Sequence, residues 1–516
     1  MKIRKIVVVL GIICLASIML GCSKKPATPA PEAGAKAERG LTVGVLVEPQ
    51  VMSTLYTRDS NNTDQPVLYQ MYDTPLYIDS ATGEIKPWLA TSWEFTPDML
   101  QLTMKFRDDV YFHNGYKMTA EDVKFTIDTA EAMYPNRFGN LDYVELLDEY
   151  TIKVHFTAPY APILNWLCCR YYCILSKKYW DEVGQQGYED KPIGTGPFQF
   201  VSRTPGDRIV MDRYDNYWKG PAQFNRVTIR PVPDVNTLLL ALQTGEVDVV
   251  LYAPIENMLR LNDPNIEWNS GNSTASMFLK FSFLETSFVQ NDLNFRKAVQ
   301  YAADKEAMNQ AVFGGRATLI DIVGFDKFST RPIAGTYSTY THDVEKAKEF
   351  LAASNYRGQE FRLVTRAGST EARVTEVLQG SLQEIGINAR VVPVDNATYL
   401  DISNISGDFD ARMEAATASI IDADRWFLDF ARERITFGQR WQGMGVNELD
   451  SLVHRAREEP DYDKRLALWT EAATVNNDAV NIIYFMVDAD TIAFRKDLKD
   501  VKLHFARYIR MWEWGY

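Results

Sequence analysis

The sequence predicts an α/β fold, because strand-like and helix-like segments alternate along the chain. The clearest case is residues 360–394, where a β-rich run is followed by a helical pattern and then by a second strand. That order predicts a βαβ unit with a parallel pair of strands. A second helix-to-strand junction spans residues 234–251, with Asp234 as the expected N-cap and Gly245 as the expected helix end.

The other helices are predicted from their caps, in chain order. Thr119 and Asp122 resemble a capping box ahead of a buried stripe at helical spacing. Three more helices are expected to start at acidic caps: Asp292, Asp304 and Asp343. With 516 residues, the chain has room for two or three domains of this kind.

The first twenty-two residues predict export. A basic start precedes an apolar stretch at residues 6–20, which is too short to span a bilayer comfortably. Met19-Leu20-Gly21-Cys22 is close to the bacterial lipobox, in which the Cys thiol carries diacylglycerol. We therefore expect a lipoprotein signal peptide at residues 1–21 and lipidation of Cys22. An uncleaved anchor helix is the alternative, and both place the rest of the chain outside the cytoplasm.

Residues 22–40 are rich in Lys, Pro, Ala and Glu and are expected to form a flexible tether. The folded body should start near Leu41. Of the five cysteines, Cys168, Cys169 and Cys173 fall within that body. They have no second Cys pair or His at ligand spacing, so we expect buried small apolar side chains, and whether two of them form a disulfide stays open.

Composition and motifs exclude several functions. A net charge of −13 argues against nucleic-acid binding, which needs a basic face. The five histidines are all more than four residues apart, so no helix offers two imidazoles to one metal. Gly194-Thr195-Gly196-Pro197-Phe198 lacks the third Gly of a dinucleotide fingerprint and predicts a structural turn. No nucleophile with a partner base is visible, so we expect no enzyme, no cofactor and no metal.

Four groups of segments resemble one family, the extracellular solute-binding proteins of family 5, which are the dipeptide, oligopeptide and nickel receptors of ABC importers. They occur in the family's order from about residue 40 to residue 490. The matching segments are Pro87-Trp88-Leu89-Ala90-Thr91-Ser92-Trp93 with residues 106–123; Gly194-Thr195-Gly196-Pro197-Phe198 with Asn216-Tyr217-Trp218 and residues 242–248; residues 295–305; and residues 346–351 with 382–387.

This resemblance implies a two-lobed fold of the periplasmic-binding-protein kind, type II, with the ligand cleft between the lobes. The first lobe would comprise residues 41–278 plus 488–516, with an extra subdomain at about 65–185. The second lobe would comprise residues 279–487. Hinge strands are expected near residues 277–283 and 482–487.

The resemblance also implies where the ligand binds. Peptide-binding relatives hold the ligand's α-amino group with an Asp, and the matching position here is Ser419. Ordinary dipeptide binding would therefore need Asp422 or Asp424 to replace that contact, because a buried ammonium needs a balancing charge. The candidate ligand-binding residues are Tyr56 in the first lobe and Asp422, Asp424, Arg425, Trp426 and Trp441 in the second.

Together these observations predict a monomeric, lipid-anchored substrate-binding protein of an ABC importer, periplasmic if the producer has an outer membrane. Its partners would be the ABC permease, the membrane through its N-terminal lipid, and a peptide or peptide-like solute. An oligosaccharide is the first alternative and a nickel chelate the second. Functions of another class are a secreted hydrolase and a surface sensor that keeps the fold without transport.

Overall fold

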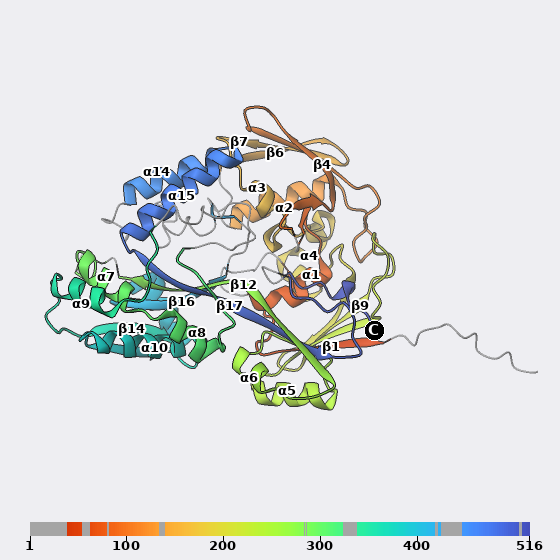
Figure 1. The fold of residues 1–516 in the computed structure, drawn as a ribbon. Coiled ribbons are helices and arrows are strands. Elements are labelled where there is room, and N and C mark those ends of the chain that lie inside the picture. Colours follow the sequence, from red (N-terminus) through yellow and green to blue (C-terminus); the bar gives the residue numbers. More distant parts are fainter. Residues whose placement is uncertain are drawn as a thin grey trace, which may run out of the picture. The chain divides into compact units, whose positions relative to one another are not determined.

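The computed structural model describes residues 39–53, 62–79, 82–133, 140–282, 284, 286–322, 338–417, 422–424, 446–504 and 508–516 (Figure 1). The predicted signal peptide and Cys22 lie outside these residues. So do four of the predicted ligand-binding residues: Tyr56, Arg425, Trp426 and Trp441. Within the described part, no helix is long and apolar enough to cross a bilayer.

Eleven strands of the described residues form one sheet, in the order β15-β14-β16-β12-β17-β11-β1-β10-β9-β8, with β13 paired to β17. Their bounds are β1 Gly40–Val45, β8 Phe198–Thr204, β9 Arg208–Arg213, β10 Arg226–Pro231, β11 Val249–Leu251, β12 Ile266–Phe281, β13 Thr318–Leu319, β14 Phe361–Arg366, β15 Ala389–Val394, β16 Ala411–Thr417 and β17 Ile482–Arg495. The strands that are far apart in sequence therefore meet in a single hydrogen-bonded sheet.

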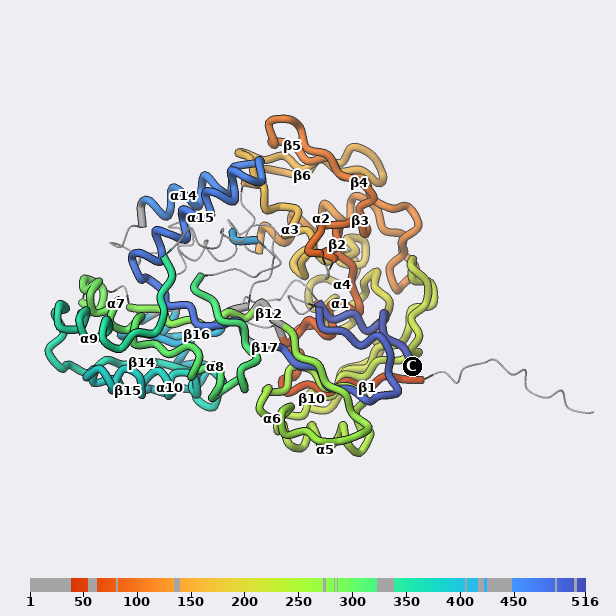
Figure 2. The backbone as a smooth tube through the Cα atoms, viewed as in Figure 1, coloured from red at the N-terminus to blue at the C-terminus, as the bar shows by residue number. Residues whose placement is uncertain are grey.

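Two long antiparallel strands, β12 and β17, join the two ends of this sheet. Figure 2 shows them side by side, and their register runs from the pair Ile266 and Arg495 to the pair Lys280 and Ile482. At one end β17 pairs with β11, and at the other end β12 pairs with β16. The two segments expected as hinge strands lie on this pair, although the hinge role and the lobe boundaries stay predictions.

The described residues also form thirteen α-helices. They are α1 Gln65–Met71, α2 Ala120–Met133, α3 Ile163–Trp166, α4 Lys177–Asp190, α5 Val235–Thr244, α6 Ile255–Arg260, α7 Leu293–Ala302, α8 Lys305–Phe313, α9 Val344–Ala352, α10 Thr370–Glu384, α11 Asn396–Asp401, α14 Val446–Glu458 and α15 Tyr462–Asp478. Helix α10 joins the parallel strands β14 and β15, which confirms the predicted βαβ unit.

The acidic caps predicted from the sequence are confirmed. Asp234, Asp292, Asp304 and Asp343 each accept a hydrogen bond from the backbone N–H three residues later, at 2.8 to 3.0 Å. These bonds satisfy amide groups that the first helical turn leaves free. Gly245 ends α5 with φ of 80°, a left-handed conformation that glycine adopts without strain.

Four further strands form a separate antiparallel sheet. Its strands are β4 Ala90–Phe95, β5 Gln101–Phe106, β7 Thr151–Phe156 and β6 Leu141–Asp148, in that spatial order. Helix α2 packs against β6 and β7. The backbone N–H and the hydroxyl of Thr119 donate to Asp122 at 2.9 and 3.3 Å, so the predicted capping interaction forms.

The buried apolar residues form two large cores. One runs from Leu41 to Leu251 and resumes from Ile492 to Trp514, and we call the body around it the first lobe. The other runs from Ile255 to Val487, and we call the body around it the second lobe. Because β12 and β17 contribute to both lobes, the chain crosses between them within continuous strands.

The glycine motif passes closely over the end of α1. A Cβ on Gly194 would stand 2.0 Å from the carbonyl oxygen of Met71, and one on Gly196 would stand 2.6 Å from the carbonyl carbon. The N–H of Gly196 donates to the Met71 carbonyl at 2.9 Å. The motif therefore has a packing role, as the sequence predicted.

Candidate functional site

Each lobe contains parallel strands whose carboxyl ends lie at one edge. In the first lobe β1 is parallel to β10 and β11, and in the second lobe β14 is parallel to β15 and β16. Open α/β sheets bind their ligands outside the carboxyl ends of the strands. The side chains at these edges, and those where the two lobes touch, are therefore the candidates for solute contact.

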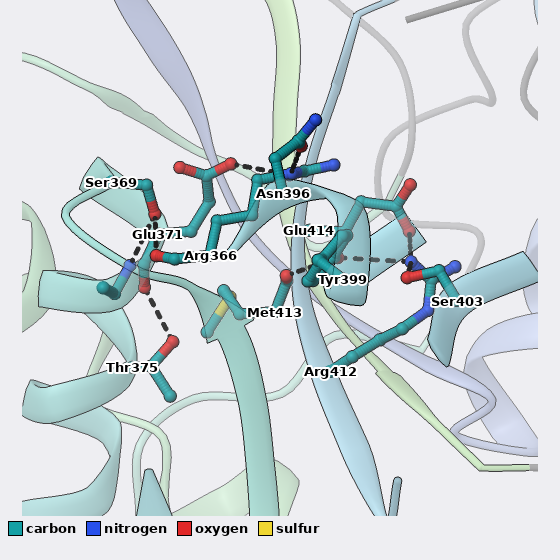
Figure 3. Close-up of polar contacts among 11 residues, drawn as sticks. Arg366, Ser369, Glu371, Thr375, Asn396, Tyr399, Ser403, Arg412, Met413 and Glu414 are labelled. Atoms are coloured by element: carbon teal, nitrogen blue, oxygen red, sulfur yellow. Dashed lines mark hydrogen bonds and ion pairs between the residues drawn. The ribbon is translucent and has the colours of Figure 1, made fainter. Parts of the chain in front are cut away.

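Arg366 is the last residue of β14 and lies at the second-lobe edge (Figure 3). Its guanidinium pairs with Glu371 at 3.1 Å and donates to the Asn396 side-chain oxygen at 3.2 Å. The same group lies 4.0 Å from the ring centroid of Tyr399. A quarter of the Arg366 side chain stays exposed, at 25%, so a solute could reach it. Next to it, Ser369 caps α10.

A second cation, Arg412, contacts the hydroxyl of the same tyrosine. Arg412, on β16, donates to the hydroxyl of Tyr399 at 3.2 Å and to that of Ser403 at 3.1 Å, and it pairs with Glu414 at 2.8 Å (Figure 3). The Tyr399 hydroxyl donates to the Met413 carbonyl at 2.8 Å. Burial raises the pKa of Tyr399, although Arg412 acts against this shift. The phenol is thus neutral and rigidly placed.

Asp424 lies where the lobes touch. Its side chain is fully buried, accepts a hydrogen bond from the Tyr160 hydroxyl at 3.0 Å, and pairs with Arg457 at 2.9 Å. Tyr160 in turn accepts a hydrogen bond from the Trp166 indole at 2.8 Å. Since Tyr160 and Trp166 belong to the first lobe and Arg457 to α14 of the second, this carboxylate joins the two lobes.

Asp422 adds a second polar connection. Its carboxylate accepts a hydrogen bond from the side-chain amide of Asn165 at 3.2 Å and from the backbone N–H of Asp424 at 3.0 Å. Arg465 of α15 lies 3.9 Å away. A further bond joins the Ala161 N–H to the Arg457 carbonyl at 3.0 Å. We call Tyr160, Asn165, Asp422, Asp424, Arg457 and Arg465 the lobe junction.

The structure thus brings Asp422 and Asp424 together, at a contact between lobes. Both carboxylates have protein partners, so a ligand ammonium would have to displace Asn165 or Arg465 to reach Asp422. Nothing in this geometry tests ligand contact, which stays a prediction for both residues. Ligand contact also stays a prediction for the four candidates outside the described residues.

Sequence reasoning missed Arg366, Tyr399 and Arg412. One signal was available for Arg366, because it stands at the carboxyl end of the strand in the predicted βαβ unit. Tyr399 and Arg412 gave no such signal. They lie on α11 and β16, and their contact is a tertiary one that no local sequence pattern marks.

The described residues contain free thiols but no clustered metal ligands. No group of three or more His, Cys, Asp and Glu side chains there could hold a metal ion. Cys168, Cys169 and Cys173 are free thiols and are buried. Burial raises the pKa of the Cys168 and Cys173 thiols well above the ordinary value, which makes them poor nucleophiles.

Two α/β lobes joined by a pair of crossing strands define a two-lobed periplasmic binding protein of type II. The comparisons agree, and the chain belongs to the bacterial extracellular solute-binding proteins, family 5, whose model matches residues 84–436. Members of this family bind solutes outside the cytoplasm and are not enzymes.

Curated relatives match over most of their length. Heme-binding protein A of Haemophilus influenzae is 25% identical over 479 residues, which cover 86% of this chain and 84% of the relative. The dipeptide-binding protein of Escherichia coli is 25% identical over 492 residues, which cover 88% of this chain and 89% of the relative. Similar chains are thus named for different solutes.

A solved structure shows the same fold. The periplasmic binding protein DppA from Helicobacter pylori, in complex with the peptide STSA, matches with a TM-score of 0.78 and 22% identity. The match covers 92% of this chain and 98% of that one.

Proposed function

We propose that this protein captures a peptide or peptide-like solute between its lobes and delivers it to the permease of an ABC importer. A lipid on Cys22 would hold the protein, as a monomer, at the cell membrane. The observation that carries the peptide assignment is the second-lobe edge, where Arg366 offers a partly exposed guanidinium beside the rigid phenol of Tyr399. The dipeptide-binding relative and the peptide-bound DppA support the same class of solute.

Arg366 is suited to the terminal carboxylate of a peptide. A guanidinium presents paired N–H donors that match a carboxylate, and such charge-assisted bonds are about twice as strong as neutral ones. Glu371 and Asn396 hold the group in place but leave part of it exposed. A solute carboxylate would therefore meet a cation whose orientation is already fixed, which lowers the entropy cost of binding.

The lobe junction supports capture by closure. Tyr160 and Asn165 come from one lobe, and Asp422 and Asp424 from the other, and all four side chains are buried together. Contacts of this kind form only when the lobes come together. A solute that bridges the lobes would favour the same arrangement, because a ligand shifts a conformational equilibrium toward the state it binds better.

Titration calorimetry with tripeptides and their C-terminal amides tests this proposal. We expect the wild-type protein to prefer the free carboxylate by about tenfold, and Arg366→Gln to lose that preference. Arg390→Gln is the control. Arg390 lies near the start of β15, at the opposite end of the strands from Arg366, where its side chain is 52% exposed and pairs with Glu360. Binding of an oligosaccharide or of a nickel chelate, with no binding of any peptide, would overturn the peptide assignment.

A further inference from the structure

A pocket lies within the first lobe, apart from the lobe junction and the second-lobe edge. It is an open hollow with a volume of about 400 Å³, which falls in the range of small-molecule sites. Its wall includes Tyr77, Trp88 and Trp218 as aromatic members and Lys86, Arg107 and Lys219 as cations. In a chain with a net charge of −13, a cavity lined by three cations and three aromatic rings is unusual.

One buried carboxylate fixes the aromatic wall. Asp73 accepts hydrogen bonds from the indole N–H of Trp88 at 2.8 Å and from that of Trp218 at 3.1 Å. It also accepts from the hydroxyls of Tyr217 and Thr195, each at 3.1 Å. The two indoles meet edge to face, with centroids 5.1 Å apart and an angle of 82°. The orientation of the two indole rings is therefore fixed without a ligand.

A cationic side chain lies over the ring of each of the two indoles. The ammonium of Lys219 lies 4.1 Å from the centroid of Trp88, and the guanidinium of Arg107 lies 4.3 Å from that of Trp218. Arg510 lies 3.8 Å from the centroid of Tyr77, in the adjoining wall. Cation–π contacts of this kind place positive charge directly against the cavity.

Lys219 differs from Arg107 in having no direct ion pair among the described residues. Arg107 is paired with Asp109 at 2.6 Å, whereas no carboxylate of the described residues lies within ion-pair distance of Lys219. Partial burial and the positive charge of Arg510 lower the pKa of Lys219, although the carboxylates of Glu513 and Asp73 act against this shift, so its charged form is held at a net cost. An anion beside it would remove that cost.

We propose that this pocket binds a small organic anion with a flat aromatic body, such as an aromatic carboxylate. The Lys219 ammonium would bind the charge, and the two indole rings would pack on the body. The site lies in one lobe, so its occupancy requires neither the proposed peptide nor closure of the lobes.

Saturation-transfer NMR on the full chain, with 2-naphthoate as the probe and neutral 2-naphthamide for comparison, tests the site. We expect saturable binding of 2-naphthoate, at least tenfold weaker binding of the amide, and about a tenfold loss of naphthoate affinity in Lys219→Ala. Lys219→Arg should retain binding. Lys178→Ala is the matched control, because Lys178 lies 4.0 Å from the ring of Tyr116, outside this pocket.

Three results would overturn the proposal: no saturable binding of naphthoate, equal affinity for the amide, or an affinity that Lys219→Ala leaves unchanged. Arg366→Gln separates this pocket from the proposed solute site. If that substitution abolishes naphthoate binding, the probe occupies the second-lobe edge and the first-lobe site is rejected. Because the Lys219 side chain is only partly buried, its substitution should change the unfolding midpoint little, and this midpoint is measured for every variant.

Discussion

Asp424 places a fully buried negative charge between the lobes, opposite Arg457. Asp424→Asn removes the negative charge that faces this guanidinium, so we expect the free energy of unfolding to fall by about 3–5 kcal/mol. Urea unfolding measures this loss of stability. Asp128→Asn is the control, because Asp128 forms an exposed pair with Lys124 whose loss should cost about 1 kcal/mol or less. Equal losses in the two variants would contradict a buried ion pair.

His113 should make stability depend on pH. Its ring bonds to Gly194 and Gly196, and burial lowers its pKa to about 4. In the unfolded chain the pKa is about 6.5, so the unfolded state alone takes up a proton between these values. Stability should therefore fall as the pH decreases from about 6.5 to 4, by up to about 1.4 kcal/mol per pH unit. Urea unfolding of wild type and His113→Gln checks this, and identical pH profiles would refute it.

At the scale of elements, the glycine motif fixes how its loop meets α1. Gly196→Ala would place a Cβ 2.6 Å from the carbonyl carbon of Met71, so we expect a loss of about 1–3 kcal/mol. Gly380→Ala is the matched control. Gly380 lies inside α10 with no heavy atom within 4 Å of an added Cβ, so helix propensity should stabilise that variant by up to about 1 kcal/mol. Thermal unfolding distinguishes them, and an unaffected Gly196→Ala would contradict the close contact.

Elements with local signals could be predicted from the sequence. A cap such as Asp234 accepts a hydrogen bond from an amide only three residues away. In the βαβ unit, helix α10, Gly386 and strand β15 follow one another directly in the sequence.

The lobe junction could not be predicted from the sequence. Tyr160 and Asp424 are 264 positions apart, and neither stands in a local pattern that marks a buried bond. Arg412 meets Tyr399 only because β16 pairs with β14.

At the scale of the whole molecule, the junction should couple lobe contact to solute affinity. Tyr160→Phe removes a hydroxyl that donates to a charged group across the lobes, a bond of about 1.5–3 kcal/mol. If the bond forms on closure, peptide affinity should fall about tenfold or more, as measured by calorimetry. Tyr143→Phe, on an exposed tyrosine stacked on His155, should change nothing. If Tyr160→Phe left the peptide affinity unchanged, the lobe junction would have no part in solute capture.

Solute capture is the central claim, and native mass spectrometry of the full chain tests it most directly. The protein is incubated with a mixture of short peptides, oligosaccharides and nickel–histidine, and bound masses are identified after release. We predict complexes of one peptide per chain, weakened by Arg366→Gln and unaffected by Arg390→Gln. A spectrum that shows only the unliganded chain with all three classes of solute would contradict capture.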